Sequence, residues 1–312
     1  MDNPAVRRCA YALLGVLAVL PLLATAIGDP FYLGVVTRMM IFGIAAMSLD
    51  LILGFAGLFS LGHAVYLGIG GYTVAILSHY GVTNGFMHFG AAIAVSAFAA
   101  FVIGLVSLRT SGVFFLMITL AFSQMVYFLA ISINAFGGDD GLEISAPSAL
   151  GLDLREPLVL YYVVFATLAL VLILGFRLVN SRFGMVIRAV KYNESRMIAV
   201  GFPTPRYKLT AFVISGAVCG LAGALLANQT LFVSPSLIQW VRSGELLIMV
   251  IAGGMGTLVG PVIGAILYLL LEQVLSGWTV YWPGIVGALL LVLVLVGKRG
   301  VLGFITERRR AA

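Results

Sequence analysis

Residues 158–176 read LVLYYVVFATLALVLILGF, an apolar run without a charged residue. A single α-helix needs about 20 such residues to cross the hydrocarbon core of a bilayer. Similar runs recur along the chain of 312 residues, of which 62% are hydrophobic and only 10% charged, and the mean hydropathy is +1.12. A soluble domain carries about 25% charged residues. The sequence therefore predicts an all-α integral membrane protein and excludes a water-soluble globular domain.

Apolar runs bounded by charged residues, glycine or proline predict about ten transmembrane helices. Together they make the whole chain, residues 1–312, a single transmembrane domain. The first run follows two arginines and resembles a signal peptide, but we expect an uncleaved first helix, as is usual in multispanning proteins. The helices are expected near residues 10–27, 34–53, 64–80, 86–107, 112–133, 158–176, 209–228, 244–257, 260–276 and 282–297.

The positions of the basic residues predict how the chain is oriented in the membrane. Most of the 18 lysines and arginines lie in four regions: residues 7–8, Arg109, residues 177–208 and residues 298–310. Ten crossings place all four regions on one side, and basic residues collect on the cytoplasmic side. Both termini and the loop 177–208 are therefore expected in the cytoplasm. Membrane orientation also explains the net charge of +6 without a nucleic-acid partner.

Two apolar segments contain several glycines and look interrupted. Residues 54–71 read GFAGLFSLGHAVYLGIGG, and residues 252–264 read AGGMGTLVGPVIG. One segment lies in each half of the chain, which is the arrangement of broken helices in transporters built from repeats. Broken helices expose backbone N–H and C=O groups to a cavity. Close packing of helices through small residues is an equally good interpretation of the same sequence.

Asp50 is an acidic residue inside the second apolar run, where an unpaired charge is costly. Arg38 lies twelve residues away, about 18 Å along a helix, so the two side chains meet only if the helix is kinked. Asp50 is either functional or placed close to the cytoplasmic interface. Glu245 and Glu272 allow the same two interpretations.

Two loops are long enough to have structure of their own. Loop 134–157 contains the acidic turn sequence GGDDG at residues 137–141 and is expected outside the cytoplasm, as a docking surface for a partner. Loop 177–208 has apolar residues at helical spacing, followed by Pro203 and Pro205. We interpret it as one or two short amphipathic helices that dock a cytoplasmic partner, and a solvated loop is the alternative.

The order and spacing of these motifs resemble the permeases of branched-chain amino acid ABC transporters, in particular the larger permease subunit. The strongest match is GLFSLGHA at residues 57–64, which is similar to the family's Gly-Gln-x-Ser-Leu-Gly-His-Ala block with Leu58 in place of glutamine. Further matches are GGDDGL at residues 137–142 and GGMGTLVGP at residues 253–261. The resemblance covers nearly the whole chain.

The resemblance implies that the chain binds and passes a solute without covalent catalysis, so neither catalytic residues nor metal ligands are expected. The interrupted segments are expected to line the substrate path, with tight packing as the alternative for each residue. The path candidates are Gly57, Ser60, Gly62, His63, Gly253, Gly254, Gly256 and Thr257. His63 also fits a core histidine. The candidates for coupling to an ATPase are Arg188, Glu194 and Gly201.

The resemblance also implies the partners of the chain in a bacterial inner membrane. Two ABC ATPase subunits are expected to supply ATP and magnesium, because this sequence has no phosphate-binding Gly-x-x-x-x-Gly-Lys-Ser/Thr loop. No cofactor is expected in the chain itself. A second permease subunit, expected to be a distinct homologue, and a periplasmic substrate-binding protein complete the importer.

Three other functions stay open from the sequence. In the first alternative, the chain belongs to the same class of ABC transporter, but the solute is urea, a short amide or an aromatic acid. In the second, the chain is a secondary transporter that acts alone, because broken helices suit such carriers equally well. A membrane enzyme is the third, and no catalytic cluster in the sequence favours it.

Overall fold

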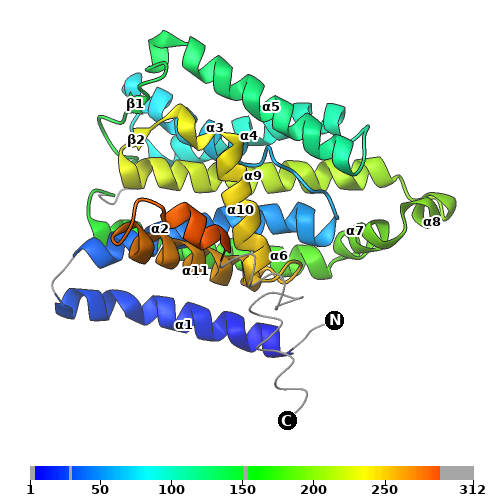
Figure 1. The fold of residues 1–312 in the computed structure, drawn as a ribbon, viewed down its shortest axis with the longest axis horizontal. Helices are drawn as coiled ribbons and strands as arrows, with labels where there is room; N and C mark the ends of the chain where they lie inside the picture. The colour runs from blue at the N-terminus through cyan, green and yellow to red at the C-terminus, as the bar shows by residue number, and fades with distance from the viewer. Residues whose placement is uncertain (1–3, 28–29, 150–153, 289–312) are drawn as a thin grey trace.

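The structure is a computed structural model that describes residues 4–27, 30–149 and 154–288, most of which are helical (Figure 1). The helices are α1 (Pro4–Ile27), α2 (Pro30–Asp50), α3 (Ala64–His79), α4 (Gly85–Ser107), α5 (Val113–Ser132), α6 (Pro157–Asn180), α7 (Arg182–Tyr192), α8 (Glu194–Ala199), α9 (Thr204–Thr230), α10 (Trp240–Gly253) and α11 (Val259–Ser276). The short elements are the π-helical turn η1 (Leu51–Phe55), the 3-10 turns η2 (Asn134–Phe136) and η3 (Pro235–Leu237), and the strands β1 (Leu142–Glu143) and β2 (Phe232–Val233).

Within the described ranges, six helices are long and apolar enough to cross a membrane. They cover residues 31–55, 85–107, 113–132, 157–180, 204–230 and 259–276, and Arg8–Pro21 and Ala64–His79 are shorter apolar helices. The expectation of an all-helical, multispanning fold is confirmed, whereas the count of about ten crossings stays a prediction. The last expected helix, 282–297, is helical over residues 282–288, and its remainder and the basic tail lie outside the described residues.

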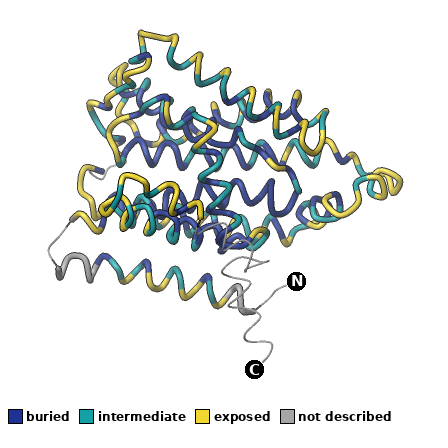
Figure 2. Tube along the Cα trace, in the orientation of Figure 1, coloured by how far each residue is buried: buried dark blue, intermediate teal, exposed yellow. Residues whose placement is uncertain are grey.

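The helices α2 and α9 form the centre of the molecule (Figure 2). In an apolar 18-residue stretch of each span, 83% of the residues are buried in α2–η1 and 61% in α9, but only 17% in α5. Three of the main contact partners of α9 are α2, α3 and α4. Small residues make this close packing possible, because Gly223 of α9 lies directly against the backbone of Leu67 in α3.

The two long loops lie at opposite ends of the helices, with β1 and β2 at one end and α7 and α8 at the other (Figure 1). Loop 134–157 is ordered by pairing, because β1 runs antiparallel to β2 with Leu142 opposite Val233. The side chain of Asn228 in α9 accepts a hydrogen bond from Ser148 N at 2.8 Å, which fixes the same loop. This separation agrees with loops on two sides of a membrane, and which side is cytoplasmic stays a prediction.

The loop 177–208 contains a pair of helices, and its borders differ from those expected. Helix α6 continues to Asn180, and α9 begins at Thr204 rather than near residue 209. Pro203 and Pro205 separate α8 from α9, but Pro205 also lies in the first turn of α9, where its missing N–H leaves no bond unmade. The Asn193 side chain accepts from Arg196 N at 2.9 Å and starts α8 as a helix cap.

The contact between α3 and α9 predicts which glycine substitution destabilises the fold. A Cβ at Gly223 would overlap the carbonyl oxygen of Leu67 and lie 3.1 Å from Gly71 N, and backbone atoms have little room to move. We expect Gly223→Leu to cost about 3 kcal/mol of stability, through overpacking. Gly90 of α4 has no atom within 4 Å of a Cβ and supplies the control, Gly90→Leu. Thermal unfolding in detergent measures both, and a wild-type melting temperature for Gly223→Leu would contradict this packing.

Candidate functional site

The first non-helical segment follows α2. The helix widens into η1, and residues 56–63 are not helical before α3 begins at Ala64. Ser60 Oγ accepts a hydrogen bond from Gly62 N at 3.2 Å, and Thr119 Oγ1 of α5 accepts one from Leu61 N at 3.3 Å. Ser60 is fully buried, and a Cβ at Gly62 would meet the carbonyl oxygen of Thr119. These contacts hold the segment within the protein interior.

The second non-helical segment, residues 254–258, separates α10 from α11. Gly256 has a φ of 75°, in the left-handed region that favours glycine. Thr257 Oγ1 donates to the carbonyl of Gly254 at 2.7 Å and accepts from Gly260 N at 3.0 Å. Gly253 and Gly254 are buried, and Gly253 packs on the backbone of Gly260. A single hydroxyl therefore stabilises the turn and the start of α11.

The carboxylate of Asp50 joins the two segments. Its Oδ1 accepts a hydrogen bond from Gly256 N at 2.7 Å and its Oδ2 accepts one from Leu258 N at 3.3 Å, while the side chain is fully buried. A buried charge is tolerated when hydrogen bonds satisfy it, and the N-terminus of a helix such as α11 favours a negative charge. Gly54 completes the contact, since a Cβ there would collide with this carboxylate and with Gly256.

His63 lies in the core, away from any described cavity. The ring is fully buried, with Nε2 2.9 Å from Ser48 Oγ of α2 and 3.5 Å from Ser215 Oγ of α9. Its edge packs on the ring of Tyr66, and Nδ1 has no hydrogen-bond partner within the described chain. Of the two interpretations of His63, the structure favours the core histidine, which ties α2 and α9 to the start of α3.

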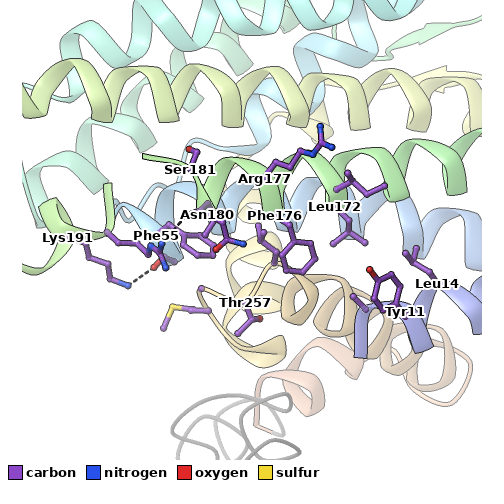
Figure 3. Close-up of a pocket in the computed structure, with 18 of the residues that line it drawn as sticks. Tyr11, Leu14, Phe55, Leu172, Phe176, Arg177, Asn180, Ser181, Lys191 and Thr257 are labelled. Carbon is purple, nitrogen blue, oxygen red and sulfur yellow. Dashed lines mark hydrogen bonds between the residues drawn. The ribbon is translucent and has the colours of Figure 1, made fainter. Parts of the chain in front are cut away.

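A cavity of about 870 Å³ opens where the two segments meet α1, α6 and α7 (Figure 3). Figure 3 shows the side chain of Lys191 at one end of this cavity and those of Tyr11 and Leu14 at the other. Gly256 and Thr257 are the path candidates that line it. The other path candidates are not among the described lining residues: Gly57, Ser60, Gly62, His63, Gly253 and Gly254.

The three coupling candidates lie in the loop that contains α7 and α8. Arg188 donates from Nη2 to the carbonyl of Val179 at 3.0 Å and so braces the corner between α6 and α7. Glu194 Oε2 accepts a hydrogen bond from Lys208 Nζ at 2.6 Å, and this ion pair connects α8 to α9. Gly201 has a φ of 93° in the turn between these two helices, with open space around it. None of the three contacts the segments 51–63 or 254–258 in the hydrogen bonds and ion pairs of the described residues.

Lys191 makes the contact that the sequence did not single out. Its Nζ donates to the carbonyl of Gly54 in η1 at 2.6 Å, and a Cβ at Gly57 would lie 2.9 Å from its Cγ. The π-helical turn leaves carbonyl groups without a regular i+4 partner, and a lysine ammonium satisfies one of them. Helix α7 therefore reaches the first segment directly, and through Asp50 the second.

The site has no geometry of a metal centre in the part of the chain that is described, where no three His, Cys, Asp or Glu side chains are grouped to hold an ion. Its groups are backbone amides and carbonyls, one hydroxyl and a buried carboxylate, placed where helices end inside an apolar bundle. That arrangement defines a polytopic helical membrane protein of the transport class.

The chain belongs to the family described as the permease component of branched-chain amino acid transport systems, whose model matches residues 31–295. It is therefore a membrane permease subunit of the ABC transporter class, as the sequence resemblance indicated. No solved structure matches the chain.

Curated relatives carry similar names. The high-affinity branched-chain amino acid transport system permease protein LivM of Salmonella typhimurium is 28% identical over 92% of this chain and 74% of its own length. LivM of Escherichia coli is 28% identical over 90% of this chain and 73% of its own length. The L-arabinose ABC transporter permease protein AraH of Azospirillum brasilense is 29% identical, but over 58% of this chain and 55% of its own length.

The Asp50 bridge predicts a difference between two substitutions. Asp50→Ala leaves the N–H groups of Gly256 and Leu258 without an acceptor, and hydrogen bonds to a buried charge are worth about 1.5–3 kcal/mol each. Asp50→Asn keeps one acceptor oxygen. We expect thermal unfolding of the purified chain to show a clear loss of stability for Asp50→Ala and a smaller one for Asp50→Asn. Equal melting temperatures for wild type and Asp50→Ala would show that the bridge contributes nothing.

Proposed function

We propose that this chain is the membrane permease of an ATP-driven importer for branched-chain amino acids. The observation that carries the proposal is the match of the permease family over residues 31–295. The relatives that cover most of the chain are named for branched-chain amino acid transport, whereas the arabinose permease covers little more than half of it. A binding protein delivers the solute, and ATPase subunits on the cytoplasmic side drive its release.

The joined segments 51–63 and 254–258 are the proposed gate. Transport requires that the solute and the ATPases favour different states of the permease, because a ligand shifts a conformational equilibrium only through different affinities. The Asp50 bridge has few bonds: two backbone N–H groups on one carboxylate. Breaking it would separate the two segments and open the interior onto the cavity lined by Gly256 and Thr257. The remaining path candidates then support the gate from inside the bundle.

The helices α7 and α8 are the proposed docking site for an ATPase. They lie at the end opposite to β1 and β2 (Figure 1). The basic residues of the loop 177–208 and of the sequence near both termini support placing all three in the cytoplasm. Arg188, Glu194 and Gly201 fix the shape of the docking site, and Lys191 passes its movement to η1. A second permease subunit, two ATPases and the binding protein complete the assembly, and loop 134–157, at the opposite end, faces the binding protein.

Reconstitution tests the function directly. The chain is purified from its native membrane in mild detergent with its partners, placed in liposomes and supplied with ATP at the cytoplasmic side. We expect leucine uptake that needs ATP and the binding protein, because this chain has no ATPase motif. Uptake of leucine by the chain alone, without ATP, would instead establish a secondary transporter. Uptake of urea or of an aromatic acid, but not of leucine, would change the cargo.

The contact of Lys191 predicts a loss of coupling. We expect Lys191→Met to lower the leucine transported per ATP hydrolysed by about tenfold, which is within the usual range of coupling free energies. Arg109 lies exposed outside α7 and α8 and gives the control, Arg109→Met. Lys191→Arg keeps a donor and should recover part of the coupling. The same ratio in Lys191→Met and wild type would remove this contact from the mechanism.

A further inference from the structure

Four charged side chains meet within the membrane-spanning part of the molecule. They come from three helices: Arg38 from α2, Arg242 and Glu245 from α10, and Glu272 from α11. Arg242 Nη1 donates to Glu245 Oε2 at 2.8 Å, and Arg38 Nη2 lies 3.9 Å from Glu272 Oε1. The charges of Arg38, Arg242 and Glu245 all act on Glu272, so the four side chains form one cluster with no net charge.

The two pairs in this cluster differ in a way that matters for binding. The Arg242–Glu245 pair has the distance of a charge-assisted hydrogen bond, about 2.7–2.9 Å, and it is closed. The Arg38–Glu272 pair is about one ångström longer, so it lacks a direct hydrogen bond. The guanidinium of Arg38 lies over the ring of Phe42, 5.7 Å from its centroid. Arg38 and Glu272 therefore keep hydrogen-bonding capacity for a third molecule.

The Arg38–Glu272 pair, called the open pair below, faces outward from the helix bundle. The side chain of Arg38 is 42% exposed and that of Glu272 is 20% exposed, although both belong to helices apolar enough to span the membrane. A charge facing lipid is costly, and charges in membrane helices face a bundle interior or a water-filled cavity. The exposure of this pair therefore argues against a position of this face of α2 and α11 in contact with lipid.

The open pair also lies on the far side of the gate from α7. Arg38 precedes Asp50 by twelve residues, about 18 Å along α2. Glu272 lies in the last turn and a half of α11. The start of α2 and the end of α11 both lie toward the β1–β2 end of the molecule (Figure 1). If α7 faces the cytoplasm, a solute from the outside reaches this pair before it reaches Asp50.

We propose that Arg38 and Glu272 bind the charged head of a zwitterionic α-amino acid in the outer half of the transport path. The guanidinium receives the carboxylate of the solute, and the carboxylate of Glu272 receives its ammonium group. The Arg242–Glu245 pair, which lies within α10, stays closed. This proposal rests on the proposed function and adds the place where the cargo is recognised.

The chemistry explains both selection and release. An amino acid exchanges one loose ion pair for two, so it leaves no charge unpaired. A solute with only a carboxylate or only an amine leaves one protein charge without a partner in a poorly solvated place, which is costly. Because the solute competes with the existing pair, it is held only weakly, as passage through a transporter requires.

The experiment measures the leucine transported per ATP hydrolysed by the complete complex in liposomes with its binding protein. Glu272→Gln and Arg38→Gln each remove one of the two charges. We expect each variant to lower this ratio by about tenfold, while the loaded binding protein still stimulates ATP hydrolysis. Arg109→Gln changes an exposed charge outside the cluster and should leave the ratio unchanged.

A double variant separates recognition from a structural ion pair. Arg38→Met/Glu272→Met removes both charges and leaves none unpaired, so a purely structural pair would tolerate it. We expect this variant to assemble and to hydrolyse ATP without transporting leucine, even if the single variants fail to assemble. Recovery of the wild-type ratio in the double variant, or an unchanged ratio in the single variants, overturns the site. Absence of ATP-driven leucine uptake in the wild-type complex would instead overturn the proposed function.

Discussion

The carboxylate of Asp50 is the constraint on which the centre of this structure depends. This acidic side chain lies at the end of the largely apolar helix α2 and is fully buried. Such a group needs donors, and the nearest are the backbone amides of Gly256 and Leu258 at the start of α11. The non-helical segment before α11 therefore supplies the hydrogen bonds that the carboxylate of Asp50 needs, and the same hydrogen bonds hold this segment against α2.

The same constraint explains why neighbouring positions are small. Gly54 and Gly256 approach each other so closely that a Cβ at Gly54 would occupy the place of the carboxylate and of the turn. Gly54 itself is buried, and its carbonyl accepts a hydrogen bond from Lys191 of α7. An exposed lysine and a buried aspartate thus act on two sides of one short π-helical turn, which links α7 to the interior without a long chain of contacts.

Local features of the chain were predictable from the sequence, and contacts between distant segments were not. Apolar run length gives the helices, and the glycines and prolines give most of their ends to within a few residues. The spacing in the loop 177–208 indicates α7 and α8. Asp50 stands out as costly, but its partners lie more than 200 residues away in the chain, and Arg38, the nearest cation in its own helix, pairs with Glu272 instead.

Lys191 was missed for a related physical reason. On a loop rich in basic residues, one lysine cannot be told from the others by sequence, and only the fold places Lys191 against the carbonyl of Gly54. The path candidates divide in the same way: glycine-rich sequence marks both non-helical segments, but the cavity is formed by Gly256 and Thr257 together with α1, α6 and α7.

The charges of the membrane helices show how one fold reconciles opposite electrostatic demands. Asp50 is enclosed and satisfied by fixed backbone dipoles, so it stabilises a closed contact and gains nothing from a passing solute. Arg38 and Glu272 are partly exposed and loosely paired, so they retain attraction for a molecule that carries both charges. A transporter needs both kinds of site: one that closes in the absence of solute, and one whose charged groups bind the solute in preference to each other. In the proposed mechanism, Arg38 and Asp50 lie about 18 Å apart on α2, so this helix connects recognition to the gate.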